Sequence, residues 1–507
     1  MRSRLLALLL ATACMALPAA AQTPSEIRIG LGDDPGSLDP ATNASFVGRI
    51  VLQSACDKLV DIDVDGNIVP MLATSWDWAA DGKSVTMKLR EGVVYHDDTP
   101  FDAESAKGNL ERYLTMQGSR RRPEIEAIEK VEAIGKDTIK ISLKEPSVAL
   151  LALFTDRAGM MVSLPAFEKA GVQAFANRPI CAGPYRVADF KPQQSVTLER
   201  FPKHWRASAY SFDRVTFEPF PDSNVRLLNL RSGRLDLIEQ VAPTSLASVE
   251  ADPNLRITVG QQPAFTMIQF NLTAPRASEA FAKHPEVRQA FSLAIDRTAL
   301  NQVVFSGRYV PGHQPFPPGN VWFDETSPAP QPRDVARARA LLRQVGVPNP
   351  TLELLISTNS EHMEVAQVVQ QMVAEAGFRM EIRTMEFIAM RNAALQGNFQ
   401  AYMVPSAGRV DPDLNISLFI ACGVANNVGK YCSQELDGLL AQGRAVADRN
   451  ARKPIYQKAV QTIQRDAPII FLFNQRSAFG HKAVVQGFKG FPDGIVRLEG
   501  VTKVAGR

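Results

Sequence analysis

Hydrophobic and polar residues alternate along this chain with the periods of both strands and helices. Residues 84–89 place apolar and polar side chains in turn, which is the period of a half-buried strand. The turn signal Asp81-Gly82 stands just before them, so we predict a β-hairpin around this dipeptide. Asp102 precedes a helix-like run and is its expected N-cap.

Two later blocks repeat the order strand, helix, strand. In the first block, "RVTFEPF" and "LDLIEQV" flank the helix-like "SNVRLLNLRSGR", which we expect to stop at Gly233. In the second, strand-like and helix-like segments alternate over residues 351–405, which is typical of a mostly parallel sheet covered by helices. A helix-like segment between the blocks is opened by Pro285 and closed by Gly307. The pattern predicts two α/β lobes.

The length and composition agree with this organisation. The chain has 507 residues, well beyond the size at which one hydrophobic core keeps growing. Hydrophobic residues make up 45% and charged residues 21%, which are ordinary values for globular proteins. We therefore expect a packed protein of at least two folding units.

The first 21 residues have the features of a secretory signal. Arg2 and Arg4 precede an apolar run that ends in three alanines, so we predict cleavage before Gln22 and a mature protein in the periplasm. Lipid attachment at Cys14 is the less favoured alternative, because Ala11 stands where a lipoprotein signal usually has leucine. No later stretch approaches the roughly 20 uninterrupted apolar residues of a membrane span.

The charge balance gives no support for polyanionic partners. The full chain has a formal net charge of +3, and loss of the signal's two arginines lowers it to about +1. This balance gives no electrostatic reason to expect nucleic acid or an anionic membrane surface as a partner.

Four cysteines remain after the signal. Cys422 and Cys432 flank a short loop rich in glycine and asparagine, and in an oxidising compartment we predict a disulfide between them. For Cys56 and Cys181 we favour free buried thiols.

Catalytic and metal-binding signatures are missing from the sequence. The six histidines are scattered, with no HExxH motif and no zinc-ligand spacing, and no GxSxG motif occurs. We therefore expect no enzyme, no catalytic residue, no metal and no cofactor. A secreted hydrolase acting on peptide-like substrates is the alternative, because scattered carboxylates can form an acid/base pair in space.

A series of motifs resembles one protein family in order and over nearly the whole mature chain. The motifs are "DPGSLDP", "PMLATSWDWAADGKSVTMKLREGVVYHDDTPFDAESA", "AGPYRV" followed by "HW", "SGRLDL", "FNLTAP", "VRQAFSLAIDR", "DPD" and "PDGIVRLEGV". Together they resemble the peptide/nickel-type (family 5) periplasmic solute-binding proteins of bacterial ABC importers, which include dipeptide- and oligopeptide-binding proteins.

The resemblance implies a two-lobe α/β periplasmic binding protein of type II, with an extra small subdomain in the first lobe. Two crossover hinge segments, near residues 269–275 and 471–481, would join the lobes. The implied limits are 22–270 for lobe I, with the subdomain at about 67–178, then 271–475 for lobe II and 476–507 for a C-terminal return to lobe I. Such a monomer closes on a peptide or peptide-like molecule and delivers it, unchanged, to ABC transporter permease subunits in the inner membrane.

The turn "SAGRVDPDLN", residues 406–415, departs from the family pattern. Dipeptide- and oligopeptide-binding members carry an aspartate for the ligand's amino group three positions before the first Asp of "DPD", and here that position is Gly408. Arg409 stands beside it, and a guanidinium facing the cleft would favour an acidic ligand. Alternatively, Arg409 braces the turn by pairing with Asp411 or Asp413.

The remaining candidate contacts are less specific. We favour Asp413 as a helix cap and leave Asp411 as a contact for a cation on the ligand. Phe46 and Tyr402 are candidates for the cleft wall, although aromatic residues in such places are more often core, and Asn474 lies in the expected second crossover. The predicted ligand-binding set is Gly408, Arg409, Asp411, Phe46, Tyr402 and Asn474.

Overall fold

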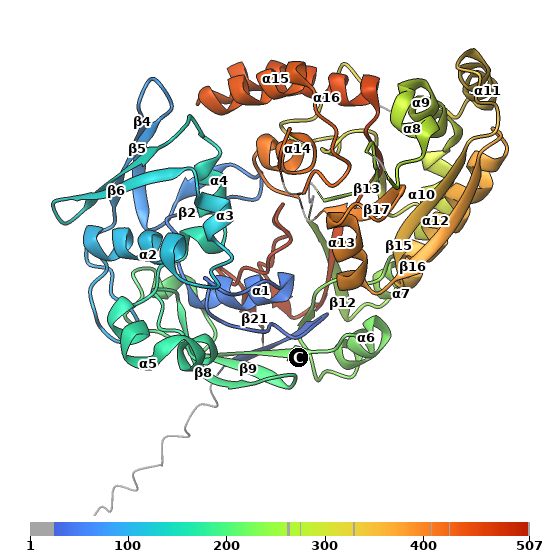
Figure 1. Cartoon of the computed structure of the whole chain (residues 1–507). Coiled ribbons are helices and arrows are strands. Elements are labelled where there is room, and N and C mark those ends of the chain that lie inside the picture. The colour runs from blue at the N-terminus through green and yellow to red at the C-terminus, as the bar shows by residue number, and fades with distance from the viewer. Residues whose placement is uncertain are drawn as a thin grey trace, which may run out of the picture.

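The computed structural model describes residues 25–504 with the exception of 261–263, 274, 328–329, 407 and 425. The expected signal peptide and Cys14 lie outside the described residues. The described chain folds into two lobes, with the first on the left and lower side of Figure 1 and the second on the right and upper side. Among the described residues, no helix has both the length and the apolar character needed to cross a membrane.

A seven-stranded sheet forms the first lobe, in the order β12-β19-β11-β1-β10-β9-β8. The central strand β1 pairs in parallel with β10 and β11, and the outer pairs are antiparallel. The predicted strand, helix, strand block is confirmed as β10, α6 and β11. The strands are β1 Glu26–Leu31, β8 Tyr185–Lys191, β9 Ser195–Arg200, β10 Arg214–Pro219, β11 Leu237–Ile238, β12 Leu255–Gly260 and β19 Ser477–Lys482; the helices are α1 Phe46–Ala55, α5 Leu164–Asn177, α6 Ser223–Arg231 and α7 Leu246–Glu250, with short 3-10 turns η2 Ala207–Ala209 and η3 Pro243–Ser245.

A small antiparallel sheet, β4-β5-β7-β6, extends from the first lobe together with the β2–β3 hairpin. The predicted hairpin is confirmed, because Asp81-Gly82 joins β4 to β5. The predicted cap is confirmed as well: the Asp102 carboxylate accepts a hydrogen bond from Ser105 N at 2.9 Å. The elements are β2 Val60–Ile62, β3 Ile68–Pro70, β4 Ala73–Trp78, β5 Ser84–Leu89, β6 Ile128–Ile134, β7 Thr138–Leu143, α2 Ala103–Thr115, α3 Arg122–Ile125, α4 Leu150–Phe154 and η1 Arg157–Gly159.

The second lobe has a six-stranded sheet in the order β14-β18-β13-β17-β15-β16. Only β16, β15 and β17 run parallel, and the expectation of a mostly parallel sheet is therefore wrong. Strand β13 brings the chain in from the first lobe and β18 leads it back out, and both pair antiparallel with their neighbours. The strands are β13 Phe265–Phe270, β14 Val310–Pro311, β15 Thr351–Ser357, β16 Arg379–Met385, β17 Ala401–Ser406 and β18 Ile469–Asn474.

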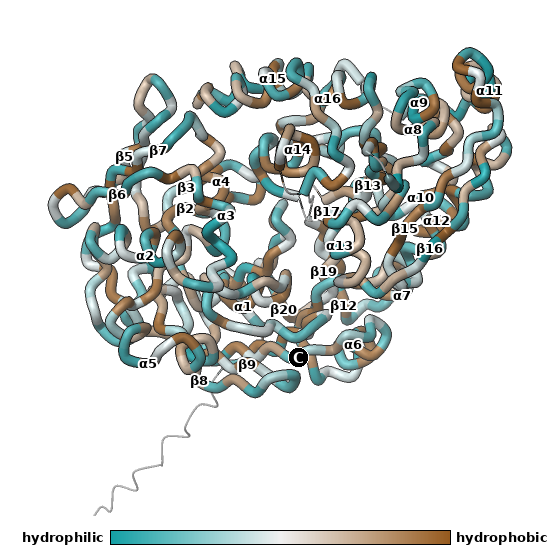
Figure 2. The backbone as a smooth tube through the Cα atoms, viewed as in Figure 1, coloured by the Kyte–Doolittle hydropathy of each residue, from teal (hydrophilic) through white to brown (hydrophobic). Residues whose placement is uncertain are grey.

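Helices cover both faces of this second sheet. Strands β13 and β18 are buried along their whole length, and alternate residues enter separate cores on the two faces. Figure 2 shows the resulting concentration of hydrophobic residues inside the lobe. One face is covered by α9 Pro285–Ala294, α10 Arg297–Phe305, α11 Val335–Gln344 and α12 Ser360–Ala374; the other by α14 Pro412–Ile420, α15 Gln434–Ala445 and α16 Arg449–Asp466, while α8 Glu279–Lys283 and α13 Phe387–Leu395 complete the lobe.

The chain passes between the two sheets twice. The first passage lies between Gly260 and Phe265, ahead of residues 269–275, because β13 already belongs to the second sheet. The second lies between Asn474 and Ser477, inside the segment expected from the sequence. Beyond it, the hairpin β20 Val485–Gln486 and β21 Thr502–Lys503 packs in the first lobe. The lobe limits given above stay a prediction.

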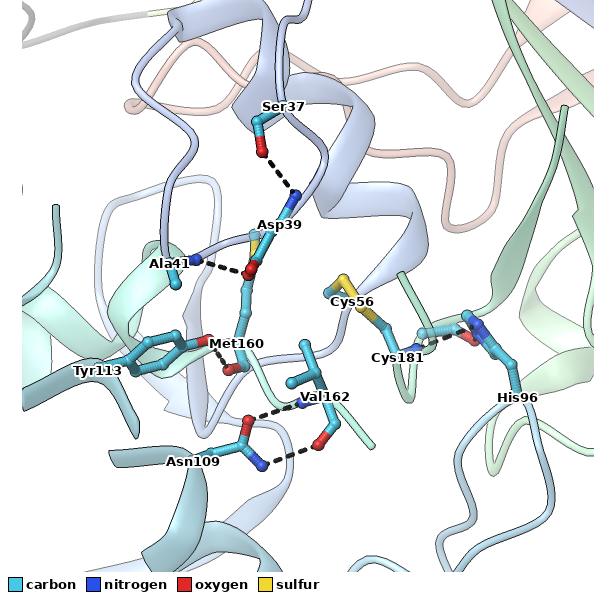
Figure 3. The surroundings of a disulfide bond; sticks show 11 residues. Ser37, Asp39, Ala41, Cys56, His96, Asn109, Tyr113, Met160, Val162 and Cys181 are labelled. Carbon is cyan, nitrogen blue, oxygen red and sulfur yellow. Dashed lines mark hydrogen bonds between the residues drawn. A yellow bond between two sulfur atoms is a disulfide. The ribbon is translucent and has the colours of Figure 1, made fainter. Parts of the chain in front are cut away.

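Two disulfides are formed. The predicted Cys422–Cys432 bond is confirmed. The expectation of free thiols at Cys56 and Cys181 is wrong, because these residues are joined with a Cα–Cα distance of 4.9 Å. They stand 125 residues apart in sequence, and only packing of the end of α1 against the segment before β8 brings them together (Figure 3).

The two disulfides are expected to contribute unequally to stability. Loop closure scales with loop length, so removal of the 125-residue link by Cys56→Ala/Cys181→Ala should cost about 5 kcal/mol of unfolding free energy, against about 3 kcal/mol for Cys422→Ala/Cys432→Ala. Denaturant unfolding under non-reducing conditions measures both. Non-reducing peptide mapping of the wild type is the control, and a peptide linking Cys181 to Cys422 would contradict the pairing.

Candidate functional site

The charged turn at residues 406–415 leads from β17 into α14. Asp411 is the N-cap of this helix, and its carboxylate accepts a hydrogen bond from Asp413 N at 2.9 Å. The expectation that Asp413 caps the helix is wrong, because Pro412 occupies the first helical position and the cap is the residue before it.

Both carboxylates of the turn are satisfied within the second lobe. Asp411 receives two hydrogen bonds from Arg452, at 2.8 and 3.0 Å, and both side chains are buried. The carboxylate of Asp413 accepts a hydrogen bond from Arg444 Nε at 3.0 Å. The alternative in which Arg409 braces the turn by pairing with one of these carboxylates is therefore wrong.

Arg409 instead reaches across to the small subdomain. Its backbone N–H donates to Asn415 Oδ1 at 2.7 Å, which fixes the turn, while its Nη1 donates to the carboxylate of Asp156. Beside this ion pair, Leu414 of α14 packs against Ala149 and Ala152. Arg409 is thus a direct polar link between the two lobes.

Asp156 lies at the centre of a cluster of guanidinium groups. Its side chain is 6% exposed, and Arg49 Nε and Arg157 Nε lie 3.0 and 3.4 Å from its Oδ1. Burial alone would raise the pKa of Asp156, but the positive charges of Arg49, Arg157 and Arg409 hold it well below its ordinary value. The carboxylate stays ionised, and the lobe junction keeps an excess of positive charge.

A cavity of about 240 Å³ opens at the carboxyl end of β17, beside this junction. Three residues of the predicted ligand-binding set line it: Tyr402, Gly408 and Arg409. The other lining residues are Gln269, Phe387, Arg391, Ala394, Leu395, Val404, Pro405, Ser406, Leu414, Leu418, Phe419, Asn426 and Val428. Carboxyl ends of parallel strands are the usual place for ligands in α/β folds.

The other three predicted contacts lie elsewhere. Asp411 lines a separate cavity of about 330 Å³ between the small subdomain and the second lobe, whose wall includes Trp76 and Trp322. Phe46 packs against the core of the first lobe. Asn474 is buried and donates to the Pro315 carbonyl at 3.2 Å. The structure therefore brings together only half of the set.

The lining of the β17 cavity suits an anionic group. Arg391 and Arg409 supply two guanidinium groups, and the side chain of Arg391 has no ion pair among the described residues. Burial raises the pKa of Tyr402 to about 12, so that its hydroxyl stays protonated and can donate. Sequence reasoning missed Arg391, because an arginine on an exposed helix face carries no signal of its own.

Comparison with known proteins identifies the family of the chain. Residues 67–427, more than half of the chain, match the model of the bacterial extracellular solute-binding proteins, family 5 Middle. The chain belongs to this family. The resemblance found in the sequence motifs is confirmed.

Relatives of this family 5 protein cover nearly its whole length. The glutathione-binding protein GsiB of Pectobacterium atrosepticum is 29% identical over 486 residues, 93% of each chain. The solved structure of the PBP AgaA from A. tumefacien R10, in complex with agropinic acid, has a TM-score of 0.81 at 26% identity and covers 95% of this chain and 99% of its own. These relatives are binding proteins rather than enzymes.

A third similarity concerns the fold alone. The Helicobacter pylori periplasmic binding protein DppA, in complex with the peptide STSA, has a TM-score of 0.80 at 23% identity, covering 95% of this chain and 98% of its own. With AgaA, it confirms the predicted two-lobe α/β fold.

A buried acid lies at the corresponding edge of the first sheet. Glu239 follows β11, and its Oε1 accepts a hydrogen bond at 2.6 Å from the backbone N–H of Gly32, which follows β1. The side chain is almost fully buried, and its Oε2 has no hydrogen-bond partner among the described residues. Burial raises the pKa of Glu239 to about 7, although the Gly32 N–H and Arg226 oppose this shift.

Glu239 should make stability depend on pH. Its pKa is higher in the folded protein than the ordinary 4.5, so the contribution of Glu239 to stability is greatest below pH 4.5 and falls as pH rises towards 7, by about 3 kcal/mol. Glu239→Gln should remove this part of the slope in denaturant unfolding between pH 5 and 8. Equal slopes in both proteins would contradict the raised pKa.

Arg409→Ala should loosen the lobe junction without unfolding the protein, because Asp156 keeps Arg49 and Arg157. A charge-assisted hydrogen bond contributes roughly 1.5–3 kcal/mol, so the open population should rise at least tenfold. Small-angle X-ray scattering without ligand should show a larger radius of gyration. Arg391→Ala is the matched control, since Arg391 lines the same cavity without an interlobe ion pair; equal radii in the two variants would contradict the role of Arg409.

Proposed function

We propose that this family 5 protein captures a small acidic, peptide-like molecule at the lobe junction and delivers it unchanged to the permease subunits of an ABC transporter. It acts in the periplasm after cleavage of the signal before Gln22, as a monomer. The lobes close around the ligand, and the permease recognises the closed form.

The observation that carries the acidic specificity is the charge of the β17 cavity. Two guanidinium groups, of Arg391 and Arg409, line it, and no aspartate or glutamate does so among the described residues. The two undescribed residues of this region, Ala407 and Ala425, carry no charged group either. Planar guanidinium groups match carboxylates, which they bind through paired hydrogen bonds.

The missing amine anchor supports the same specificity. Gly408 lines the cavity at the position where dipeptide- and oligopeptide-binding members have an aspartate, and it has a φ of +68°, a conformation that favours glycine. A free amino group of the ligand would therefore find no carboxylate there. Instead, it would lie beside Arg391 and Arg409, which repel it.

The names of two relatives agree with an acidic, peptide-like ligand. GsiB is a glutathione-binding protein, and glutathione is a tripeptide derivative with two carboxylates. AgaA was solved in complex with agropinic acid. We propose for this chain only the acidic character that these ligands share, and neither compound in particular.

Binding of matched probes tests the proposal. Glutathione should bind at least tenfold more tightly than its diethyl ester, in which both carboxylates are neutralised, because each charge-assisted pair is worth more than 1.4 kcal/mol. Isothermal titration measures both, and Arg391→Ala should reduce the difference, leaving the part that Arg409 supplies. Native mass spectrometry should also find an acidic compound that co-purifies.

Two results would count against this function. Equal affinity for glutathione, its diethyl ester and trialanine would contradict acidic specificity. Turnover of a peptide mixture, detected by mass spectrometry after incubation, would contradict a binding-only role, because a carrier retains its ligand stoichiometrically and forms no product.

A further inference from the structure

A second polar cavity lies within the second lobe and shares no lining residue with the β17 cavity. It has a volume of about 300 Å³ and is bordered by α9, α11, α16 and the start of β18. This volume is at the lower end of the range for small-molecule sites. Its polar lining includes Arg297, Arg337, Arg465, His313, Gln331 and Gln464.

Arg297 is a buried cation that has no acidic partner. Its side chain donates from Nε to the Phe471 carbonyl at 2.9 Å, from Nη1 to the Ser292 carbonyl at 3.1 Å and from Nη2 to Ser292 Oγ at 2.9 Å. All three acceptors are neutral and belong to residues of the cavity wall. The residue is 5% exposed, and a guanidinium has five N–H groups, so these three bonds leave two N–H groups unused.

The rim of the cavity adds a second uncompensated cation. Arg337 is exposed on α11, and its side chain makes no hydrogen bond or ion pair within the described part of the chain. Arg465 differs, because Glu435 and Asp466 already pair with it at 2.8 Å each. Arg297 and Arg337 therefore carry the unbalanced charge.

No acidic residue of the described chain lines this cavity. The carboxylate of Asp324 lies near His313, but it accepts hydrogen bonds from Thr326 Oγ1 at 2.6 Å and Gln461 Nε2 at 3.1 Å. The two undescribed residues of the neighbouring segment, Pro328 and Ala329, have uncharged side chains.

We propose that this cavity is a second binding site, separate from the lobe junction, for a small soluble anion that carries carboxylate or phosphate groups. An unpaired buried cation is costly, and an anion that accepts the remaining N–H groups of Arg297 offsets that cost. Arg337 binds the same anion from the rim of the cavity. Because the site lies within one lobe, it binds its anion whether the lobes are open or closed.

The test uses citrate and inorganic phosphate as probes, titrated calorimetrically into the mature protein at constant ionic strength set by sodium chloride. At least one probe should bind the wild type with a stoichiometry of one, and Arg337→Glu should weaken that binding at least tenfold. Arg343→Glu is the matched control, because Arg343 is exposed on the same helix and does not line the cavity. Its binding should equal that of the wild type.

Two further variants separate this site from the rest of the protein. In an Arg391→Ala background, Arg337→Glu should weaken citrate or phosphate binding by the same factor as in the wild type, since Arg391 lines only the β17 cavity. Arg297→Met should abolish binding while circular dichroism shows the native fold. If that variant fails to fold, the comparison of Arg337→Glu with Arg343→Glu decides.

Three outcomes would overturn the proposal. The first is no binding of either probe to the wild type. The second is equal losses in Arg337→Glu and Arg343→Glu, which would indicate only general surface charge. The third is the absence of any Arg337-dependent binding in the Arg391→Ala background, which would place the anion at the lobe junction.

Discussion

The junction between the lobes depends on one buried carboxylate. Asp156 belongs to the small subdomain, yet its guanidinium partners come from three places: Arg49 from α1, Arg157 from the adjoining 3-10 turn, and Arg409 from the second lobe. A buried charge is tolerated only where it is paired, so these contacts are mutually dependent. Breaking the link from Arg409 leaves the carboxylate with two partners, whereas losing the carboxylate would leave several buried cations facing one another.

The turn that presents Arg409 is held by interactions entirely inside the second lobe. Arg452 binds Asp411 and Arg444 binds Asp413, so both carboxylates are occupied by partners of the second lobe itself. Arg409 is therefore the one charged residue of this turn that is left to make an interlobe contact. Pre-ordering of this kind reduces the entropy that closure must overcome, because the turn does not have to be organised when the lobes come together.

Local sequence patterns predicted local structure, but they did not predict contacts between segments far apart in the sequence. Asp102 and Asp81-Gly82 were predictable because caps and hairpin turns depend on neighbouring residues. The short Cys422–Cys432 loop was predictable for the same reason. The Cys56–Cys181 bond and the ion pair of Arg409 with Asp156 join segments 125 residues or more apart. The antiparallel pairing of β13 and β18 depends on the crossing of the chain between sheets. No periodicity in the sequence indicates any of these. Arg391 was missed because an exposed helical arginine resembles any other.

Arg409 links the two lobes and also lines the β17 cavity, and the chemistry of its side chain makes the ion pair compatible with the ligand contact proposed above. Of its five N–H groups, a hydrogen bond to Asp156 uses only one on Nη1. The guanidinium therefore retains donors for a ligand that enters beside Tyr402 and Gly408. A ligand carboxylate in that position adds a second anion to a cluster that already has more guanidinium groups than carboxylates. Under the proposed function, ligand capture and lobe closure reinforce each other, because the ligand carboxylate and Asp156 both place negative charge beside Arg409.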